Sequence, residues 1–275
     1  MTDHAAPTPE PDDDHTAGRR DPPEQDRMSP AALRALAAHP EQMADLIHAL
    51  HRRVHDEESL LDLMGRASRE AVRLITDTHW AGVTAQFAGT PFTAAHTDDR
   101  VLIVDEGQYG QGDGPCLTAM RLDQQVAMTI DEFRGRWPQL AHAADTAGVK
   151  AFRAEPLHAR DRAVGSLNLY SARHQGLRPD PDVLTVITDY LDRGLTDYSA
   201  TRPGEDRALY LQQTLRNHRL IDHATGILMA IHDLTPAQAT DLLNLQAHRL
   251  DIPVHQAAAD IINHHTGRND NRPPP

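Results

Sequence analysis

Hydrophobic residues recur at helical spacing over 29–50, the first segment of the chain with apolar side chains to bury. A helix start is predicted at Ser29-Pro30, because serine can cap a helix and proline fits its first position. Apolar residues follow at intervals of three or four as far as Leu50. A second stretch with the same spacing covers 57–75. We therefore predict an N-terminal helix within 29–55, followed by another helix.

The pattern then changes to short runs that are typical of β-strands and are separated by turn-forming residues. These runs cover 80–88, 91–97, 100–106, 125–130, 149–157 and 163–171. Two helical pieces interrupt them, one starting at Pro115 and one over 138–147, and a final helix begins at Pro181. Strands enclosed by helices predict an α+β fold, an antiparallel sheet with flanking helices, over 56–198.

The region from Glu205 to His232 has the pattern of one long helix with two apolar faces. Leu211 and Leu215 fall on one side. The nearly opposite side carries Leu220, Ala224, Ile227, Leu228 and Ile231. One helix therefore has two partners. We predict a connector helix over 199–210 that continues from the sheet-containing region and pairs with its copy in a homodimer.

Two more amphipathic helices complete a predicted all-α three-helix bundle over 211–266. One begins at a capping box in TPAQ, 235–238, and the other near Pro253. The segment 1–28 is rich in Pro, Asp, Glu and Thr and has almost nothing to bury. It is predicted to be a disordered tail, as is 267–275.

Charge and composition exclude several classes of protein. A net charge of −13 argues against coating nucleic acid non-specifically, so any contact must be local. No apolar run approaches the roughly 20 residues that span a bilayer, and no signal peptide opens the chain, so we expect a cytoplasmic protein with no membrane partner. The single cysteine, Cys116, excludes a disulfide framework, and the 18 histidines form no HExxH or compact ligand set. We therefore predict no metal site.

Short motifs of the sheet-containing region resemble a GAF domain that stands before a C-terminal output module. In order they are GQGDGPCLTA (110–119), RWP (136–138), GV (148–149), EPL (155–157) and GSLNLYS (165–171). The resemblance implies a six-stranded sheet with a small-ligand pocket on one face, used for sensing or dimerisation. Candidate sensor-pocket residues are Tyr109, Cys116, Trp137 and Phe152. The sequence does not identify the ligand or any cofactor.

Cys116 has two interpretations. Its place at a helix N-terminus would lower the thiol pKa and suit redox sensing, whereas a small buried apolar side chain is the alternative. Trp137 is likewise a core residue or a ligand contact. No nucleophile has a recognisable base partner, the pattern of cyclic-nucleotide GAF domains is missing, and a methionine-sulfoxide-reducing GAF domain needs several cysteines. We therefore expect no catalytic residues and no enzyme activity.

The C-terminal helices resemble an ANTAR domain. The matching residues run from Leu215 through an A-x-G-I-L-M core at 224–229 and the alanines and leucines of the second helix to 257–262. The resemblance implies an output module that binds paired hairpin loops in nascent RNA and prevents transcription termination. Such modules are usually dimers that an upstream sensor switches.

Gly226 stands in the middle of a predicted helix, where glycine costs about 1 kcal/mol relative to alanine. A helical projection places it away from the core stripe, on an outer face with Arg219, Asp222 and Met229. A bare backbone on an outer face suits a partner contact. The predicted RNA-contact residues are Arg219, Asp222, Thr225, Gly226, Met229 and Thr240.

Three positions depart from the ANTAR pattern. Thr225 stands where lysine is common, Thr240 where an aromatic residue is usual, and Asn244 where a basic residue is usual. Residues 204–268 contain 5 arginines and 7 acidic residues, 5 − 7 = −2, which is unfavourable for attracting phosphates. The alternative function is therefore a dimeric protein-interaction regulator, or sensor scaffold, that does not bind RNA.

Overall fold

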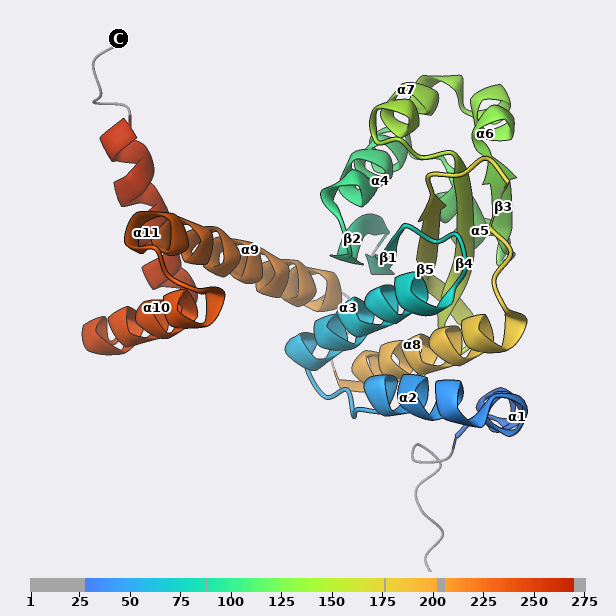
Figure 1. Ribbon diagram of the computed structural model, residues 1–275, viewed down its shortest axis with the longest axis horizontal. Coiled ribbons are helices and arrows are strands. Elements are labelled where there is room, and N and C mark those ends of the chain that lie inside the picture. Colours follow the sequence, from blue (N-terminus) through green and yellow to red (C-terminus); the bar gives the residue numbers. More distant parts are fainter. Residues whose placement is uncertain (1–27, 88, 176, 202–205, 270–275) are drawn as a thin grey trace, which may run out of the picture.

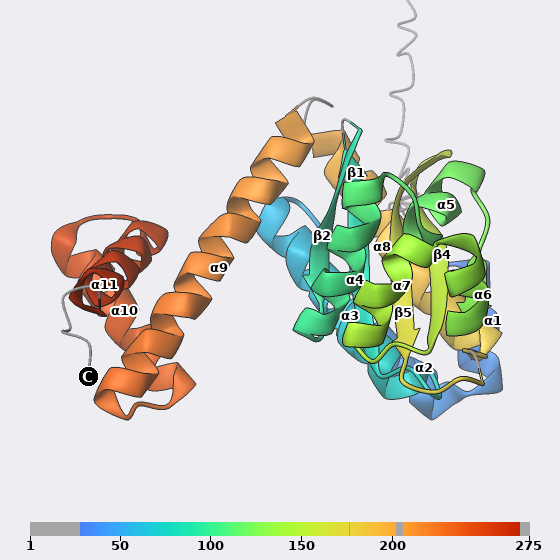
Figure 2. The same ribbon diagram turned by 90° about the horizontal axis from the view of Figure 1, so that it is seen from above.

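The protein consists of a sheet-containing unit and a C-terminal helical bundle, as the computed structural model shows (Figures 1 and 2). The predicted α+β unit followed by an all-α bundle is confirmed. The structure describes residues 28–87, 89–175, 177–201 and 206–269. The predicted disordered tail over 1–28 therefore lies outside the described residues except for Met28.

The first unit, called here the sensor unit after the role expected from the sequence, contains eight helices and five strands among the described residues. Its helices are α1 (Pro30–Ala38), α2 (Pro40–Leu50), α3 (Glu57–Leu74), α4 (Asp99–Gln111), α5 (Pro115–Leu122), α6 (Ile130–Arg136), α7 (Pro138–Thr146) and α8 (Pro181–Thr201). Its strands are β1 (Trp80–Phe87), β2 (Thr90–His96), β3 (Val126–Thr129), β4 (Ala151–Ala159) and β5 (Arg162–Ser171). The bundle contains α9 (Asp206–His232), α10 (Pro236–Leu250) and α11 (Val254–Asn269).

The sheet is antiparallel, with strand order β2-β1-β5-β4-β3. It has five strands in the described part of the chain rather than the six expected, because the run predicted as a strand over 100–106 lies within helix α4. The Asp98 carboxylate caps this helix by accepting from the backbone N–H of Arg100 at 2.9 Å. The buried positions then follow helical spacing at Val101, Val104, Asp105 and Gln108.

Helices cover both faces of the sheet. In Figure 1, α1, α2, α3 and α8 lie below the sheet, and α4, α6 and α7 lie above it. Side chains alternate along β1, so Val83 and Ala85 join the core beside α3 and α8, whereas Thr84 points to the opposite face. The same alternation in β5 sends Leu167 and Leu169 to the first core. The two faces therefore have separate cores. Only the core on the face toward which Thr84 points, opposite to α3 and α8, contains many polar groups.

The predicted N-terminal helix over 29–55 is two helices, α1 and α2, followed by a loop at 51–56. Ser29 caps α1 as expected, since its hydroxyl accepts from the backbone N–H of Ala32 at 3.0 Å. Pro40 breaks the continuity because it has no N–H to donate and restricts the preceding residue. His39 accordingly has a non-helical backbone, with φ −136° and ψ 68°.

The predicted connector helix over 199–210 lies partly outside the described residues. α8 ends at Thr201 and α9 begins at Asp206, with 202–205 outside the described residues. α9 then runs from the sensor unit to the bundle (Figure 2). Its first half packs on the sensor unit through the fully buried Leu211, and its second half enters the bundle through Ala224. The helix thus has two partners, and the first is the sensor unit of the same chain.

The end of α11 differs from the expectation of a tail over 267–275. The helix continues to Asn269, so it includes three residues of that segment, and the rest lies outside the described residues. A single glycine, Gly267, costs only about 1 kcal/mol in a helix and need not end it.

Candidate nucleic-acid interface and sensor interior

The three helices of the bundle share a core in which most of the buried residues are alanines. The buried members are Ala224, Leu228, Ala239, Leu243, Ala247, Ala257 and Ala258. A capping box starts α10: the Thr235 hydroxyl accepts from the backbone N–H of Gln238 at 3.4 Å, and the Gln238 side chain accepts from the Thr235 N–H at 2.9 Å. These contacts fix where α10 leaves the turn after α9.

Three of the five predicted RNA-contact residues of α9 share one exposed face. Arg219, Asp222 and Gly226 are all exposed, and their spacing of three and four residues places them on one side of the helix. A Cβ added at Gly226 would meet no atom within 4 Å outside its own helix backbone and neighbours. The glycine therefore leaves open backbone rather than making room for packing in its own bundle. Thr225 beside it is half-buried.

Met229 and Thr240, two other predicted RNA contacts, differ in their exposure to solvent. Met229 is half-buried and packs against the bundle core, so the outer position expected for it is wrong in part. The apolar stripe of α9 is wide enough to include Met229 at its edge. Thr240 is exposed on α10, and its hydroxyl donates to the carbonyl of Pro236 at 2.9 Å. Its side chain remains reachable from solvent.

Inside the sensor unit, Tyr109 and Cys116 belong to one small cluster. The Tyr109 hydroxyl lies 2.9 Å from the hydroxyls of both Thr84 and Thr93. Cys116 is 1% exposed, and burial raises the pKa of its thiol well above the ordinary value. The suggestion that the helix N-terminus activates this thiol is therefore wrong, because loss of water around the thiolate has the larger effect. The structure favours the buried apolar interpretation.

Trp137 and Phe152, the other two predicted pocket residues, belong to a different cluster and are core residues. Phe133 stacks on Phe152 with ring centroids 4.4 Å apart. The Trp137 indole N–H donates to the Asp113 carboxylate at 3.0 Å. Burial disfavours the charged carboxylate of Asp113, but hydrogen bonds from Trp137 and Arg121 hold its pKa below the ordinary value. The four predicted residues are thus divided between two clusters.

A buried polar network around Asp105 was missed from the sequence. The Asp105 carboxylate is completely buried, and it accepts hydrogen bonds from Thr93 at 2.9 Å and from Tyr170. Burial raises the pKa of Asp105 to about 6, although these hydrogen bonds favour the charged form. A signal existed in β5, where Ser166, Asn168 and Tyr170 repeat polar groups at every second position of a buried strand.

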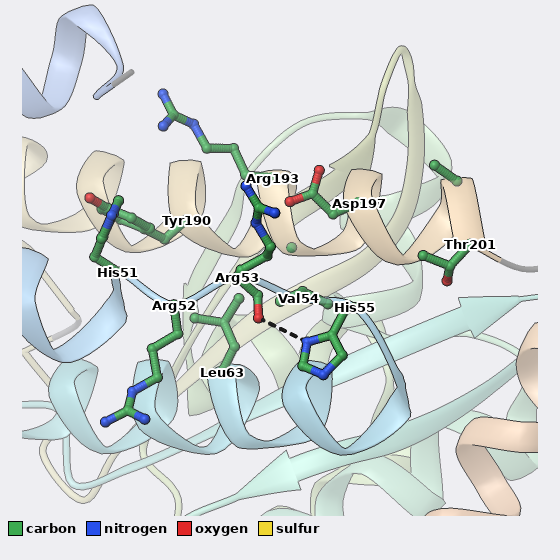
Figure 3. A pocket seen from close by; sticks show the side chains of 12 residues that line it. His51, Arg52, Arg53, Val54, His55, Leu63, Tyr190, Arg193, Asp197 and Thr201 are labelled. Atoms are coloured by element: carbon green, nitrogen blue, oxygen red, sulfur yellow. Dashed lines mark hydrogen bonds between the residues drawn. The ribbon is translucent and has the colours of Figure 1, made fainter. Parts of the chain in front are cut away.

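A mixed-charge pocket of about 320 Å³ lies between the loop after α2 and helix α8 (Figure 3). Arg53 reaches toward Asp197, whereas Arg52 points away from it (Figure 3). Burial raises the pKa of Asp197, and the nearby guanidinium groups of Arg53 and Arg193 oppose that rise. The Tyr190 hydroxyl is buried without a hydrogen-bond partner among the described residues. Since the carboxylate offsets part of the positive charge, this pocket does not select clearly for an anion.

The described residues contain neither a metal-binding cluster nor a membrane-spanning helix. None of their His, Cys, Asp and Glu side chains form a group of three or more that could hold a metal ion. Within the same residues, each helix is too short or too polar to cross a membrane.

Comparisons with known proteins address each unit separately. Residues 210–262 match the family model for the ANTAR domain. A search of curated proteins finds no match. Among solved structures, the chain is similar to the GAF domain/HD domain protein from Geobacter sulfurreducens, at 15% identity, covering 55% of this chain and 98% of that chain with a TM-score of 0.40.

Two further similar structures have other descriptions. The phycocyanobilin-bound GAF domain of a cyanobacterial phytochrome is 12% identical, with 63% of this chain and 98% of that chain covered and a TM-score of 0.40. The type II free methionine-R-sulfoxide reductase from Thermoplasma acidophilum is 12% identical, with 52% and 94% covered and a TM-score of 0.39. Residues 210–262, which match the ANTAR family model, thus lie in the helices of the C-terminal bundle, and an antiparallel sheet with flanking helices precedes them.

Proposed function

We propose that this protein is a signal-responsive transcription regulator that binds paired hairpin loops in nascent RNA and prevents termination. The observation that carries the proposal is the ANTAR match over 210–262, together with the open face of α9. The sensor unit controls when that face is available. This role requires RNA binding rather than catalysis, and it operates in the cytoplasm, where transcripts are made.

The proposed RNA contact depends little on bulk charge, because the domain has few basic residues. Loop bases that are splayed out of a hairpin are recognised by stacking and by hydrogen bonds to their edges. Arg219 offers a guanidinium plane, Asp222 an acceptor, and the backbone at Gly226 a close approach. Thr225, next to Gly226 on α9, and Thr240, exposed on α10, are the smaller proposed contacts.

A direct binding experiment tests the proposal. Fluorescence anisotropy of the full-length protein at low salt should show at least tenfold preference for tandem hairpins with matched loops over scrambled RNA of equal length. Equal affinity for the two RNAs would reject RNA recognition and favour the protein-interaction alternative.

A pair of variants on one helix tests the location of the contact. Gly226→Leu should weaken hairpin binding by about tenfold or more, because it fills the open backbone, while helicity is kept. His232→Leu adds the same side chain to an exposed position on another side of α9 and should leave affinity unchanged. Met229→Glu, also on this surface, is a less clean test because Met229 packs against the core.

The alternative function, a dimeric protein-interaction regulator, is favoured by one specific feature. A largely apolar groove of about 400 Å³ lies where α9, α10 and α11 meet, and Ile231 and Leu250 beside it are 54% and 64% exposed. Homodimerisation is expected under either function. Analytical ultracentrifugation of the full-length protein with and without RNA distinguishes a constitutive dimer from one that forms on RNA.

A further inference from the structure

A second pocket, called here the seam pocket, lies where α9 crosses the sensor unit. It has a volume of about 240 Å³. Strand β2 and helix α4 provide one wall, including Phe92, Leu102 and Glu106, and α9 provides the other, including Arg216 and Arg219. The pocket therefore exists only while the first half of α9 is seated on the sensor unit.

Two unpaired positive charges stand at this pocket. Arg216 and Arg219 lie one turn apart on α9 and have no ion pair or hydrogen bond with any residue that the structure describes. Many other arginines are paired, as Arg66 is with Asp62 and Arg121 with Asp113. In a chain with a net charge of −13, two neighbouring guanidinium groups that make no ion pair with the described residues, although the Glu106 carboxylate lines the same pocket, indicate a place for an anion.

The positive charge of the Arg219 guanidinium interacts with a residue of the sensor unit, His96 on β2. Burial lowers the pKa of His96 on β2, the charge of Asp99 opposes this, and the positive charge of Arg219 adds to it. The Nδ1 atom of His96 is buried without a hydrogen-bond partner among the described residues. An electrostatic link therefore already joins a predicted RNA-contact residue to the sheet edge.

The lining residues other than the two arginines indicate the chemistry of the uncharged part of a ligand. Phe92, Leu102 and Leu215 offer an apolar surface that fits a ring. The Glu106 carboxylate would repel a second negative charge but accept a hydrogen bond from a donor. The Tyr109 side chain also lines the pocket and continues inward to the polar network of Thr84 and Thr93.

We propose that the seam pocket binds a small aromatic anion whose carboxylate or phosphate is held by Arg216 and Arg219. Guanidinium groups recognise such planar or tetrahedral oxyanions with paired, charge-assisted hydrogen bonds. The ring packs on Phe92 and Leu102, and a hydroxyl or amine at its far end donates to Glu106. The bound anion holds α9, with Arg219, against the sensor unit.

Isothermal titration calorimetry of the full-length protein tests the site with three probes. 4-Hydroxybenzoate and phenyl phosphate represent the two anionic head groups, and 4-hydroxybenzamide is a neutral control of nearly the same shape. We expect saturable one-to-one binding of at least one anion, with the neutral amide at least about tenfold weaker. Absence of saturable binding by both anions, or equal binding of the amide, would overturn the proposal.

A matched pair of arginine variants locates the binding. Arg216→Gln removes one of the two head-group contacts and should weaken binding of the anion by about tenfold or more. Arg249→Gln removes another exposed arginine, on α10 and outside the pocket, and should have no effect. Equal affinities of Arg216→Gln and the unchanged protein would reject the assignment, with circular dichroism showing that the variants are folded.

The regulatory consequence rests on the proposed function, whereas anion binding does not. Hydrogen exchange of the α9 amides at 210–219 should slow when the anion is bound, with no RNA present. Hairpin RNA should then bind about tenfold more weakly, because Arg219 is retained at the seam. Slower exchange in a protein that never binds RNA would reject only the proposed function, and unchanged exchange would reject the seam site.

Discussion

Gly226 leaves the outer face of α9 without a side chain at a place where the helix would be more stable with one. We predict that Gly226→Ala raises the free energy of unfolding by roughly 0.5–1 kcal/mol, because a Cβ meets no atom within 4 Å there and alanine restricts the unfolded chain. Urea denaturation measures the change. Hairpin affinity should fall at the same time, so stability and binding move in opposite directions.

The control for this prediction is Gly110→Ala in α4, where an added Cβ also meets nothing within 4 Å. It should stabilise the protein without changing RNA affinity. A loss of stability in Gly226→Ala would contradict the description of an open, unpacked backbone.

Asp105 is a buried acid, and its titration should be visible in stability. Between pH about 4, the ordinary range of an unfolded aspartate, and pH about 6, the folded protein holds a proton that the unfolded chain has lost. Its contribution to the free energy of unfolding therefore falls as pH rises through this window, by roughly 3 kcal/mol in total.

Asp105→Asn removes this titration. Relative to the unchanged protein, the variant should gain roughly 3 kcal/mol between pH 4 and pH 7, because it has no charge to bury at the higher pH. Urea denaturation at the two pH values gives the difference. Parallel pH profiles for the two proteins would show that Asp105 does not titrate in this range.

At the scale of elements, the start of α10 depends on its capping box. Thr235→Ala should lower the free energy of unfolding by about 1 kcal/mol, because the cap hydroxyl and its reciprocal contact with Gln238 are lost. Thermal unfolding followed by circular dichroism is the measurement. Thr240→Ala is the matched control within α10, and a loss as large there would show that the effect is not due to capping.

The elements also show how much the sequence reveals. Local rules predict the capping box of α10, the amphipathic stripes of the bundle, all five strands of the described sheet and the helical pieces that begin near 115 and 138. They do not predict the helix over the run at 100–106, since four consecutive apolar residues fit a strand or a buried helix equally well. Whether such a run forms a strand or a helix depends on where it packs relative to the rest of the sheet, and a single sequence does not give that position.

The candidate sites divide in the same way. The exposed face around Gly226 follows from helical periodicity, which is local information. The network of Asp105 with Tyr170 joins residues 65 positions apart, and the seam pocket joins Phe92 to Arg216. Such contacts depend on how elements pack against one another, and therefore no spacing rule along the chain predicts them.

At the scale of the whole molecule, α9 is attached to the sensor unit chiefly through Leu211, which is 0% exposed. Leu211→Ala should lower the free energy of unfolding by about 2–5 kcal/mol and expose the first half of α9 to proteases. Leu209→Ala removes a leucine two residues away that is 60% exposed, and should change stability by less than about 0.5 kcal/mol. Urea denaturation and limited proteolysis compare the two, and equal effects would contradict the seating of α9.

The continuity of α9 sets a geometric constraint on the molecule. Its 27 residues form a rod about 40 Å long, with the sensor contact at one end and the bundle at the other. One inserted residue between Leu211 and Ala224 would turn the outer face by about 100° around the rod, whereas seven, close to two full turns, would nearly restore it. The number of residues in that interval therefore sets the rotation of the bundle's outer face relative to the sensor contact. Only sensor units joined through a helix with matching rotation would present this face in the same direction.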